Sequence, residues 1–433
     1  MTTLRGVVGM GVTLPERPDG CNDEDITDSA TPPRVRRAAR GSGFAVAPEP
    51  ALGHDGGVKR PARSSATPLH LSSAAAALLL CAVLAGCADA PGSGSSSCAR
   101  DGDCTLGSLA DALGVHVGAA FVQGNDEPVF RTTLVEHFNS TTAPLYWEST
   151  QRTPGVFDFS VPDEVVSLAE ANGLRVRGHP LMWGRLGLPS YVRNASSPDE
   201  LRALLRGQLE AVLGRYRGRI AQYDAVNEPI TFLGADEGTD GLDGNVFWRL
   251  LGPGWVREAL DLVHEIDPEA ALFVNEFGVM TPGPKQERFY ALIRDLVESG
   301  APISGVGFQG HIRPPFLRDY DPTQEEIEAT IRRFTALGLR VEITEIDVTI
   351  DPSVPGALDA QAETYRRLTL GCFRVPGCDG LTTWGVTDKY TWIRDFFAVD
   401  GAPLLFDAEF RPKPAYFAIA DALQTLPREG DRR

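Results

Sequence analysis

The segment Gly338-Leu339-Arg340-Val341-Glu342-Ile343-Thr344-Glu345-Ile346-Asp347 decides the fold class of this chain. It leaves a helical stretch at a glycine, continues as an apolar strand and ends in two carboxylates. The same transition occurs earlier, where Gly173-Leu174-Arg175-Val176 leads into another apolar run. Strands that are apolar on both faces are typical of parallel sheets covered by helices. The repeated transition therefore indicates an α/β protein.

Eight strands of this kind can be placed along the chain, with helical stretches between them. We expect them at residues 115–121, 138–145, 174–183, 220–228, 271–278, 303–312, 340–349 and 380–388. Capping boxes mark two of the helices, at Ser197 to Glu200 and at Thr323 to Glu326, with Gly338 placed to end the second helix. Eight alternations within residues 108–426 predict one (β/α)8 TIM barrel. A doubly wound open sheet is the alternative, although no GxGxxG motif follows the first strand.

The composition limits the class of ligand. The 433 residues include 58 Asp and Glu against 41 Lys and Arg, a formal net charge of −17, with 42% hydrophobic and 23% charged residues. These fractions are typical of a soluble globular protein and exclude a wholly disordered or polytopic membrane protein. Phosphate binding requires a basic surface, so we expect no nucleic-acid partner.

The N-terminal quarter has the composition of a targeting region. Residues 1–57 show no apolar period and are interpreted as disordered, or as an extension placed before a true start at Val58. A basic segment at 59–63 precedes an apolar run at 74–86 that ends in Leu84-Ala85-Gly86-Cys87, which resembles a bacterial lipobox. The run is too short to span a bilayer, so residues 58–87 predict a lipoprotein signal with lipidation at Cys87. A buried Ala/Leu helix is the alternative reading of the run.

This targeting signal predicts where the protein resides. Residues 88–107, rich in Gly and Ser, would form a flexible tether between the lipid and the folded body. We therefore expect an exported protein that is anchored by lipid at the bacterial cell envelope or surface. Its contact with the membrane would be through the lipid alone.

The four cysteines that follow Cys87 fit an exported protein. Cys98 and Cys104 form one close pair in the sequence, and Cys372 and Cys378 form another. Four cysteines allow three connectivities; we expect local pairing, with free buried thiols as the alternative. The spacing matches no zinc motif, so we predict no metal site here.

A barrel of this kind carries its site at the carboxyl ends of the strands. Polar and aromatic residues at those ends are His179, Trp183, Asp224, Asn227, Glu228, Asn275, Glu276, Gln309, His311, Glu345, Asp347, Trp384 and Asp388. Amides and carboxylates bind hydroxyl groups and indole rings stack on sugars, so the set favours a neutral, hydroxyl-rich ligand. Glu228 and Glu345 are the candidate pair for glycoside hydrolysis, in which one carboxyl protonates the leaving oxygen and the other attacks the anomeric carbon.

Seven ordered motifs between residues 108 and 420 resemble glycoside hydrolase family 10, the retaining endo-1,4-β-xylanases. They are Arg177-Gly178-His179-Pro180-Leu181-Met182-Trp183, Tyr223-Asp224-Ala225-Val226-Asn227-Glu228, Gly307-Phe308-Gln309-Gly310-His311, Ile343-Thr344-Glu345-Ile346-Asp347, the Cys372 and Cys378 pair, Thr383-Trp384-Gly385-Val386-Thr387-Asp388, and Arg411-Pro412-Lys413-Pro414-Ala415-Tyr416. We expect a monomeric enzyme without metal or cofactor, and the resemblance implies its reaction. It would cleave xylan or xylo-oligosaccharides by double displacement.

The resemblance also assigns roles. It implies Glu228 as general acid/base, Glu345 as nucleophile and Asn227 as the partner of the sugar 2-hydroxyl. His311 would hydrogen-bond Glu345 with Asp347 behind it. The residues implied to line the sugar subsites are His179, Trp183, Gln309, Trp384 and Trp392.

Two stretches depart from the family pattern. Residues 141–147 read Thr-Thr-Ala-Pro-Leu-Tyr-Trp and lack the expected amide and lysine, with Tyr146 at the lysine's place. Gly184-Arg185-Leu186 replaces the usual His-Ser-Gln after Trp183. The side that binds the distant glycone sugar is therefore rebuilt, and three alternatives stay open. These are a retaining glycosidase acting on another β-glycoside, a cell-surface glycan-binding lipoprotein without catalysis, and a metal-dependent barrel hydrolase.

Overall fold

The computed structural model describes residues 104–121, 127–231 and 242–427. The expected extension at 1–57, the signal at 58–87 with Cys87, and nearly all of the expected tether lie outside the described residues. Within the described ranges, no helix combines the length and the apolar character needed to cross a bilayer.

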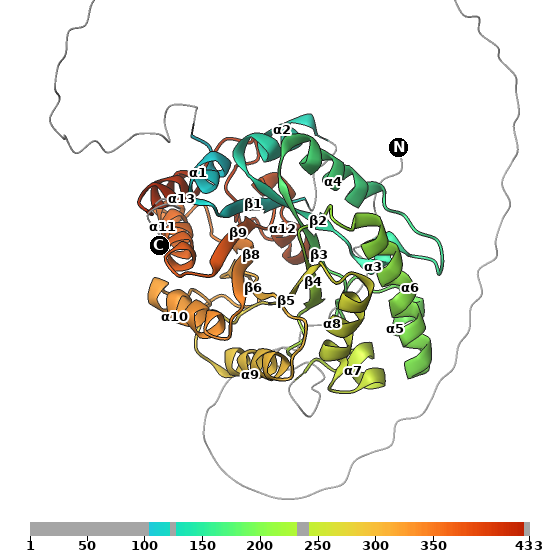
Figure 1. Ribbon diagram of the computed structural model, residues 1–433. Coiled ribbons are helices and arrows are strands. Elements are labelled where there is room, and N and C mark those ends of the chain that lie inside the picture. The colour runs from blue at the N-terminus through green and yellow to red at the C-terminus, as the bar shows by residue number, and fades with distance from the viewer. Residues whose placement is uncertain (1–103, 122–126, 232–241, 428–433) are drawn as a thin grey trace, which may run out of the picture. The chain divides into compact units, whose positions relative to one another are not determined.

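The described strands form one closed parallel barrel, as predicted (Figure 1). In Figure 1 they gather at the centre of a ring of helices. Both neighbours of β1 are parallel to it, β2 on one side and β9 on the other, and a pairing between β6 and β8 closes the ring. The strands are β1 His116–Ala120, β2 Ser140–Pro144, β3 Arg175–His179, β4 Gln222–Asn227, β5 Ala271–Glu276, β6 Gly305–Phe308, β7 His311–Ile312, β8 Arg340–Val348 and β9 Cys378–Thr383.

The sixth predicted strand, at 303–312, is wrong as one continuous element, because it is divided into β6 and β7. Gly310 between them has a φ of 82°, in the left-handed region that favours glycine. A Cβ at this position would lie 2.8 Å from Cγ2 of Ile343 and 3.0 Å from Cγ1 of Ile346. This break directs Gln309 and His311, on either side of Gly310, toward the end of the barrel. The last strand also ends earlier than predicted, at Thr383.

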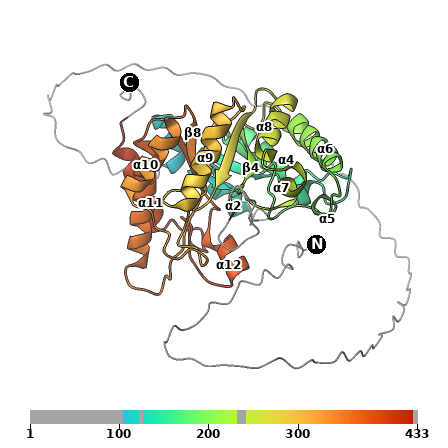
Figure 2. The ribbon, with the colours of Figure 1, turned by 90° about the horizontal axis from the view of Figure 1, so that it is seen from below.

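Helices surround the barrel, and the longer ones pack against its strands from outside (Figure 2). They are α1 Leu106–Leu113, α2 Pro128–His137, α3 Trp147–Thr150, α4 Ser160–Asn172, α5 Ser190–Arg193, α6 Pro198–Tyr216, α7 Val246–Leu251, α8 Trp255–Ile266, α9 Pro284–Glu298, α10 Gln324–Thr335, α11 Ala357–Phe373, α12 Trp392–Phe397 and α13 Pro414–Gln424. A 3-10 turn, Asp388–Tyr390, precedes α12. Helix α1 buries Leu106 completely, two residues before the expected boundary at residue 108.

The two predicted capping boxes differ in detail. At α10, Thr323 accepts from the backbone of Glu326, and the Glu326 carboxylate accepts from the Thr323 N–H in return. At α6, Ser197 accepts from the Glu200 N–H at 3.2 Å, but the Glu200 carboxylate instead accepts from the Ser196 N–H at 2.8 Å. The box at α6 therefore closes at Ser196, one residue earlier than its sequence pattern indicates.

Polar side chains fill the barrel interior in layers beneath the carboxyl ends of the strands. In the lowest layer, Gln222 donates to Glu342 at 2.6 Å, and Arg175 lies 3.3 Å from the same carboxylate. In the next layer, Arg177 pairs with Asp224, which is fully buried. Buried charges are stable only when paired and hydrogen-bonded, so these layers fix the strands in register beneath the upper end.

The expected local disulfide between Cys372 and Cys378 is present. It joins the end of α11 to the start of β9. Cys104 is half-buried just before α1, and its expected partner Cys98 lies outside the described residues, so that pairing stays a prediction.

Candidate active site

Glu345 lies on β8 and is only 3% exposed. The Asn275 side chain donates to its Oε1 at 2.6 Å, and Nε2 of His311 lies 3.3 Å from its Oε2. Burial acts to raise the pKa of Glu345. The neighbouring His179, His311 and Arg177 outweigh burial, so the pKa is lowered. A buried carboxylate that stays ionised and is held by donors has the properties of a nucleophile.

His311, on β7, joins Glu345 to a second carboxylate. Its Nδ1 lies 3.0 Å from Oδ2 of Asp347, and the Trp392 indole donates to that same oxygen at 2.6 Å. Burial alone would lower the pKa of His311, but Asp347 and Glu345 raise it to about 10. The ring is therefore an imidazolium at neutral pH and donates from both nitrogens.

Glu228 is half-buried and follows the last residue of β4. Its backbone has a φ of 53° and its N–H donates to the Asn275 carbonyl at 2.9 Å. The Gln309 side chain donates to its Oε1 at 3.0 Å. This carboxyl is thus placed by β4, by β5 and by the break between β6 and β7.

Three amides connect the two carboxylates. Oδ1 of Asn227 accepts from Asn275 at 2.8 Å and from Gln309 at 3.2 Å. Asn275 also donates to Glu345, and Gln309 also donates to Glu228. Glu228 and Glu345 therefore lie on opposite sides of one hydrogen-bonded amide bridge, at one end of the barrel.

His179, Asp224 and Glu345 are the described cluster in which a metal could be considered, since their ligand atoms lie within 4.8 Å of one another. Nδ1 of His179 lies 2.6 Å from Oδ2 of Asp224, and Arg177 pairs with the same oxygen. Nη2 of Arg177 also lies 4.0 Å from Glu345. The guanidinium supplies the positive charge that these acidic groups require, so the cluster is organised as an ion pair.

Aromatic rings surround this end of the barrel. The Trp384 ring centroid lies 5.0 Å from that of His179, and the Trp392 centroid lies 5.1 Å from that of His311. Tyr146 lies 5.7 Å from His179 and 6.0 Å from Trp183, centroid to centroid. Indole faces next to paired carboxylates are suited to sugar rings.

The structure brings all ten predicted catalytic and sugar-contacting residues to the same end of the barrel. Sequence reasoning noted Asn275 and Asp224 as strand-end residues without giving them a role, and it missed the contribution of Arg177. One signal was available: Arg175, Arg177 and His179 alternate, so all three face the barrel interior. An arginine in a buried strand needs an acidic partner, which Asp224 supplies.

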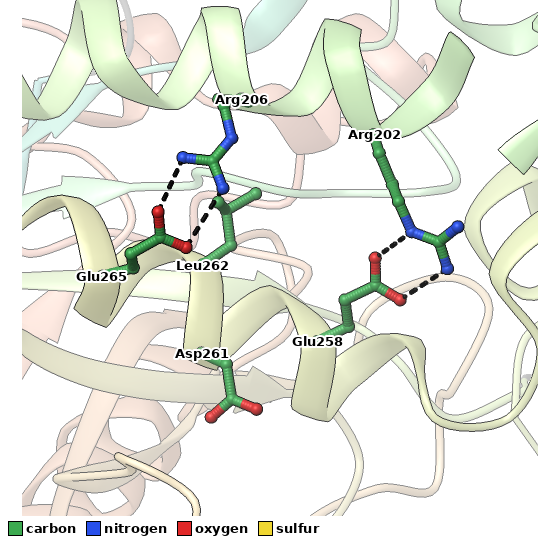
Figure 3. Close-up of a pocket in the computed structure, with 6 residues that line it drawn as sticks. All are labelled: Arg202, Arg206, Glu258, Asp261, Leu262 and Glu265. Atoms are coloured by element: carbon green, nitrogen blue, oxygen red, sulfur yellow. Dashed lines mark hydrogen bonds and ion pairs between the residues drawn. The ribbon is translucent and has the colours of Figure 1, made fainter. Parts of the chain in front are cut away.

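A shallow pocket lies on the outer ring between α6 and α8 (Figure 3). Arg202 makes two hydrogen bonds to Glu258, and Arg206 makes two to Glu265. Asp261 pairs with Arg257 at 2.8 Å. Its charged groups pair with one another, so this hollow is a surface ion-pair seam between helices.

A closed (β/α)8 barrel with an ionised carboxylate and a second carboxyl across an amide bridge defines a barrel glycoside hydrolase. Comparison with known proteins agrees. The model of Glycosyl hydrolase family 10 matches residues 105–422. The chain belongs to this family.

Similar proteins include xylanases from several organisms. The chain is 33% identical to endo-1,4-beta-xylanase B of Thermotoga neapolitana over 76% of its own length and 94% of the relative. It is 35% identical to beta-1,4-xylanase of Dictyoglomus thermophilum over 67% of its own length and 83% of the relative. The crystal structure of xylanase 10B from Thermotoga petrophila RKU-1 in complex with xylobiose superposes with a TM-score of 0.68 at 29% identity, covering 74% of this chain and 98% of that chain.

Proposed function

We propose that the protein is a retaining endo-1,4-β-xylanase that cleaves xylan or xylo-oligosaccharides. The observation that carries the proposal is the amide bridge between Glu345, with its lowered pKa, and the half-buried Glu228. The xylanases among its relatives support the substrate class.

The mechanism requires two displacements. Glu345 forms a bond to the anomeric carbon while the bond to the leaving sugar oxygen breaks, and Glu228 gives that oxygen its proton. Glu228 then takes a proton from water, water attacks the same carbon, and Glu345 departs as a carboxylate. Asn227 lies in the amide bridge that joins the two carboxyl groups and would bind the 2-hydroxyl of the reacting sugar.

The test uses arabinoxylan and aryl β-xylosides, with and without a chelator. We expect xylo-oligosaccharide products, retained anomeric configuration in the first product, and no effect of the chelator. An activated 2-fluoro glycoside should label Glu345, and Glu345→Gln should lose several orders of magnitude in kcat while keeping its fold. An inverted first product, or a label on another residue, would refute the mechanism. Binding without hydrolysis would favour a glycan-binding protein.

We also propose that the protein is exported and carried on a lipid at Cys87, and that the catalytic domain is monomeric. The lipobox-like sequence and the disulfide between Cys372 and Cys378 support export. In a bacterial host, Cys87→Ser should move the enzyme from the membrane fraction to the soluble fraction. Sedimentation of residues 104–433 should give the monomer mass.

A further inference from the structure

The backbone of Glu228 is in an unfavourable conformation. A φ of 53° in a residue with a β-carbon costs of order 1 kcal/mol or more, and such a conformation persists only when its surroundings impose it. The acid/base carboxyl is therefore aimed by a turn that other groups must hold in place.

Two neighbouring residues at the end of β5 hold that turn from both sides. The Glu228 N–H donates to the Asn275 carbonyl at 2.9 Å. Two residues further on, the Ile230 N–H donates to Oε2 of Glu276 at 3.0 Å. Between these positions, the Pro229 carbonyl accepts from the Asp243 N–H at 2.8 Å.

Glu276 is completely buried and is itself held by a cation. Its Oε1 accepts from the Phe277 N–H at 2.9 Å and lies 2.7 Å from Nζ of Lys285, in the first turn of α9. Nζ of Lys285 also lies 3.0 Å from the centroid of the Phe277 ring. Burial raises the pKa of Glu276, and the Glu228 charge adds to this, while Lys285 opposes both.

Burying an ion pair carries a desolvation cost, and such a pair is weak evidence for stability alone. The Glu276 carbonyl accepts from the Gln309 N–H at 3.0 Å, but among the described contacts neither the Glu276 carboxylate nor Lys285 reaches Glu345 or its hydrogen-bond partners. The carboxylate reaches the turn that carries Glu228 through its bond from the Ile230 N–H.

We propose that Glu276, fixed by Lys285, is a positioning residue that holds the Glu228 turn and so places the acid/base carboxyl against the leaving-group oxygen. This inference rests on the proposed glycoside hydrolysis. It concerns protonation of the leaving group and leaves the attack by Glu345 unaffected.

This division of roles predicts a dependence on the leaving group. A sugar is a poor leaving group that needs a proton, whereas a dinitrophenolate leaves without one. General acid catalysis contributes about 10²–10⁴-fold, and a displaced acid loses part of it. Glu276→Gln should therefore reduce kcat/KM on xylotriose by about tenfold or more, with kcat affected more than KM. The kcat/KM of the same variant on 2,4-dinitrophenyl β-xyloside should fall by less than about threefold.

The experiment compares Glu276→Gln, Lys285→Met and Lys285→Arg with Glu287→Gln. Glu287 is a matched control because it lies on the same helix as Lys285, is exposed and pairs with Arg333 at 2.6 Å. We expect Lys285→Met to behave as Glu276→Gln does, Lys285→Arg to recover most of the activity, and the control to match the parent enzyme. Thermal melts establish that each variant is folded.

Equal losses on both substrates, or no loss on either, would overturn the inference while leaving the proposed function intact. A parent enzyme inactive on both substrates would instead refute the proposed function. A crystal structure of Glu276→Gln supplies a readout that needs no substrate. A shifted backbone at residues 228–230 would support the inference, and an unchanged one would contradict it.

Discussion

At the scale of single residues, the ionisation of Glu345 depends on an imidazolium. Burial acts against the charge on Glu345, and His179, His311 and Arg177 together overcome it. His311 contributes both as a hydrogen-bond donor and as a charge, and its own pKa of about 10 depends on Asp347 and Glu345. The pH at which the nucleophile is lost is therefore set by His311 as much as by Glu345 itself.

We expect His311→Gln to move the acid limb of the kcat/KM profile to higher pH. Glutamine can still donate to Glu345 but carries no charge, so the pKa of the carboxyl rises and the nucleophile is protonated sooner as the pH falls. A shift of about one pH unit corresponds to about 1.4 kcal/mol of lost interaction. The measurement is kcat/KM on an aryl β-xyloside between pH 3 and pH 8. An unchanged acid limb would contradict this account.

The same substitution also predicts the sign of a stability effect. A group whose folded pKa is raised contributes stability that is fully present below its unfolded value, near 6.5, and is lost as the pH rises through its folded value. The difference in unfolding free energy between the parent and His311→Gln should thus be largest below about pH 6.5 and shrink toward pH 10. The control is substitution of His264, an exposed histidine on α8, measured over the same pH range.

Residue types at strand ends were sufficient to predict the candidate site, because parallel strands bring their carboxyl ends together. The family resemblance supplied the contacts of His311 with Glu345 and Asp347, but the sequence did not assign the amide partners of the two catalytic carboxyl groups. The bridge through Asn275 depends on the close approach of Gly307, where a Cβ would lie 2.2 Å from Oδ1 of Asn275. Such a contact between β5 and β6 leaves no periodic pattern in either strand.

At the scale of elements, the alternation of apolar runs predicted every strand of the barrel but missed the break at Gly310. The sequence pattern of an apolar run that contains a glycine is the same whether the glycine continues the strand or interrupts it. The difference lies in the φ of 82° and in the side chains of β8 against the glycine, both of which are tertiary properties. The break determines where Gln309 and His311 point, so the missed detail belongs to the site.

We expect Gly310→Ala to lower the free energy of unfolding by about 1–2 kcal/mol or more, because it adds both a strained φ and a clash with Ile343. Activity should fall with it, since Gln309 and His311 move. The matched control is Gly207→Ala inside α6, where a Cβ would meet no atom within 4 Å. It should stabilise by about 0.5–1 kcal/mol. The measurement is the free energy of unfolding of both variants in urea. If Gly310→Ala left this free energy unchanged, the break would not be sterically imposed.

The disulfide between α11 and β9 should stabilise the barrel without contributing to catalysis. Its cysteines are six positions apart, and a loop of that length restricts the unfolded chain by about 2 kcal/mol. The double variant Cys372→Ala, Cys378→Ala should lose about that much stability, with kcat unchanged. A matching loss under reducing conditions in the parent enzyme would assign the effect to the bond. A loss of kcat at temperatures where the variant is folded would contradict it.

At the scale of the whole molecule, the groups that cleave the glycosidic bond and the groups that bind the distant sugar lie in different parts of the barrel end. The cleavage groups lie on β4, on β8 and at the break after β6, and their contacts are dense. The chain after β2 carries Tyr146, whose ring contacts those of His179 and Trp183. Burial and the charges of Glu345 and Glu228 raise its pKa, so its hydroxyl stays neutral. The indole N–H of Trp183 is buried and has no hydrogen-bond partner in the described part of the chain.

This arrangement predicts how the enzyme responds to chain length. A sugar beyond the first glycone position gains transition-state stabilisation only through contacts that the protein offers it. Tyr146 offers a ring face and a neutral hydroxyl where the family pattern has a lysine, and residues 141–145 contain no amide. Extending an aryl β-xyloside to the aryl β-xylobioside should therefore raise kcat/KM by less than about thirtyfold, or about 2 kcal/mol. Tyr146→Lys should enlarge that gain, while Arg202→Gln on the outer α6 seam should leave it unchanged. A gain of about a thousandfold or more in the parent enzyme would mean that other residues grip the distant sugar.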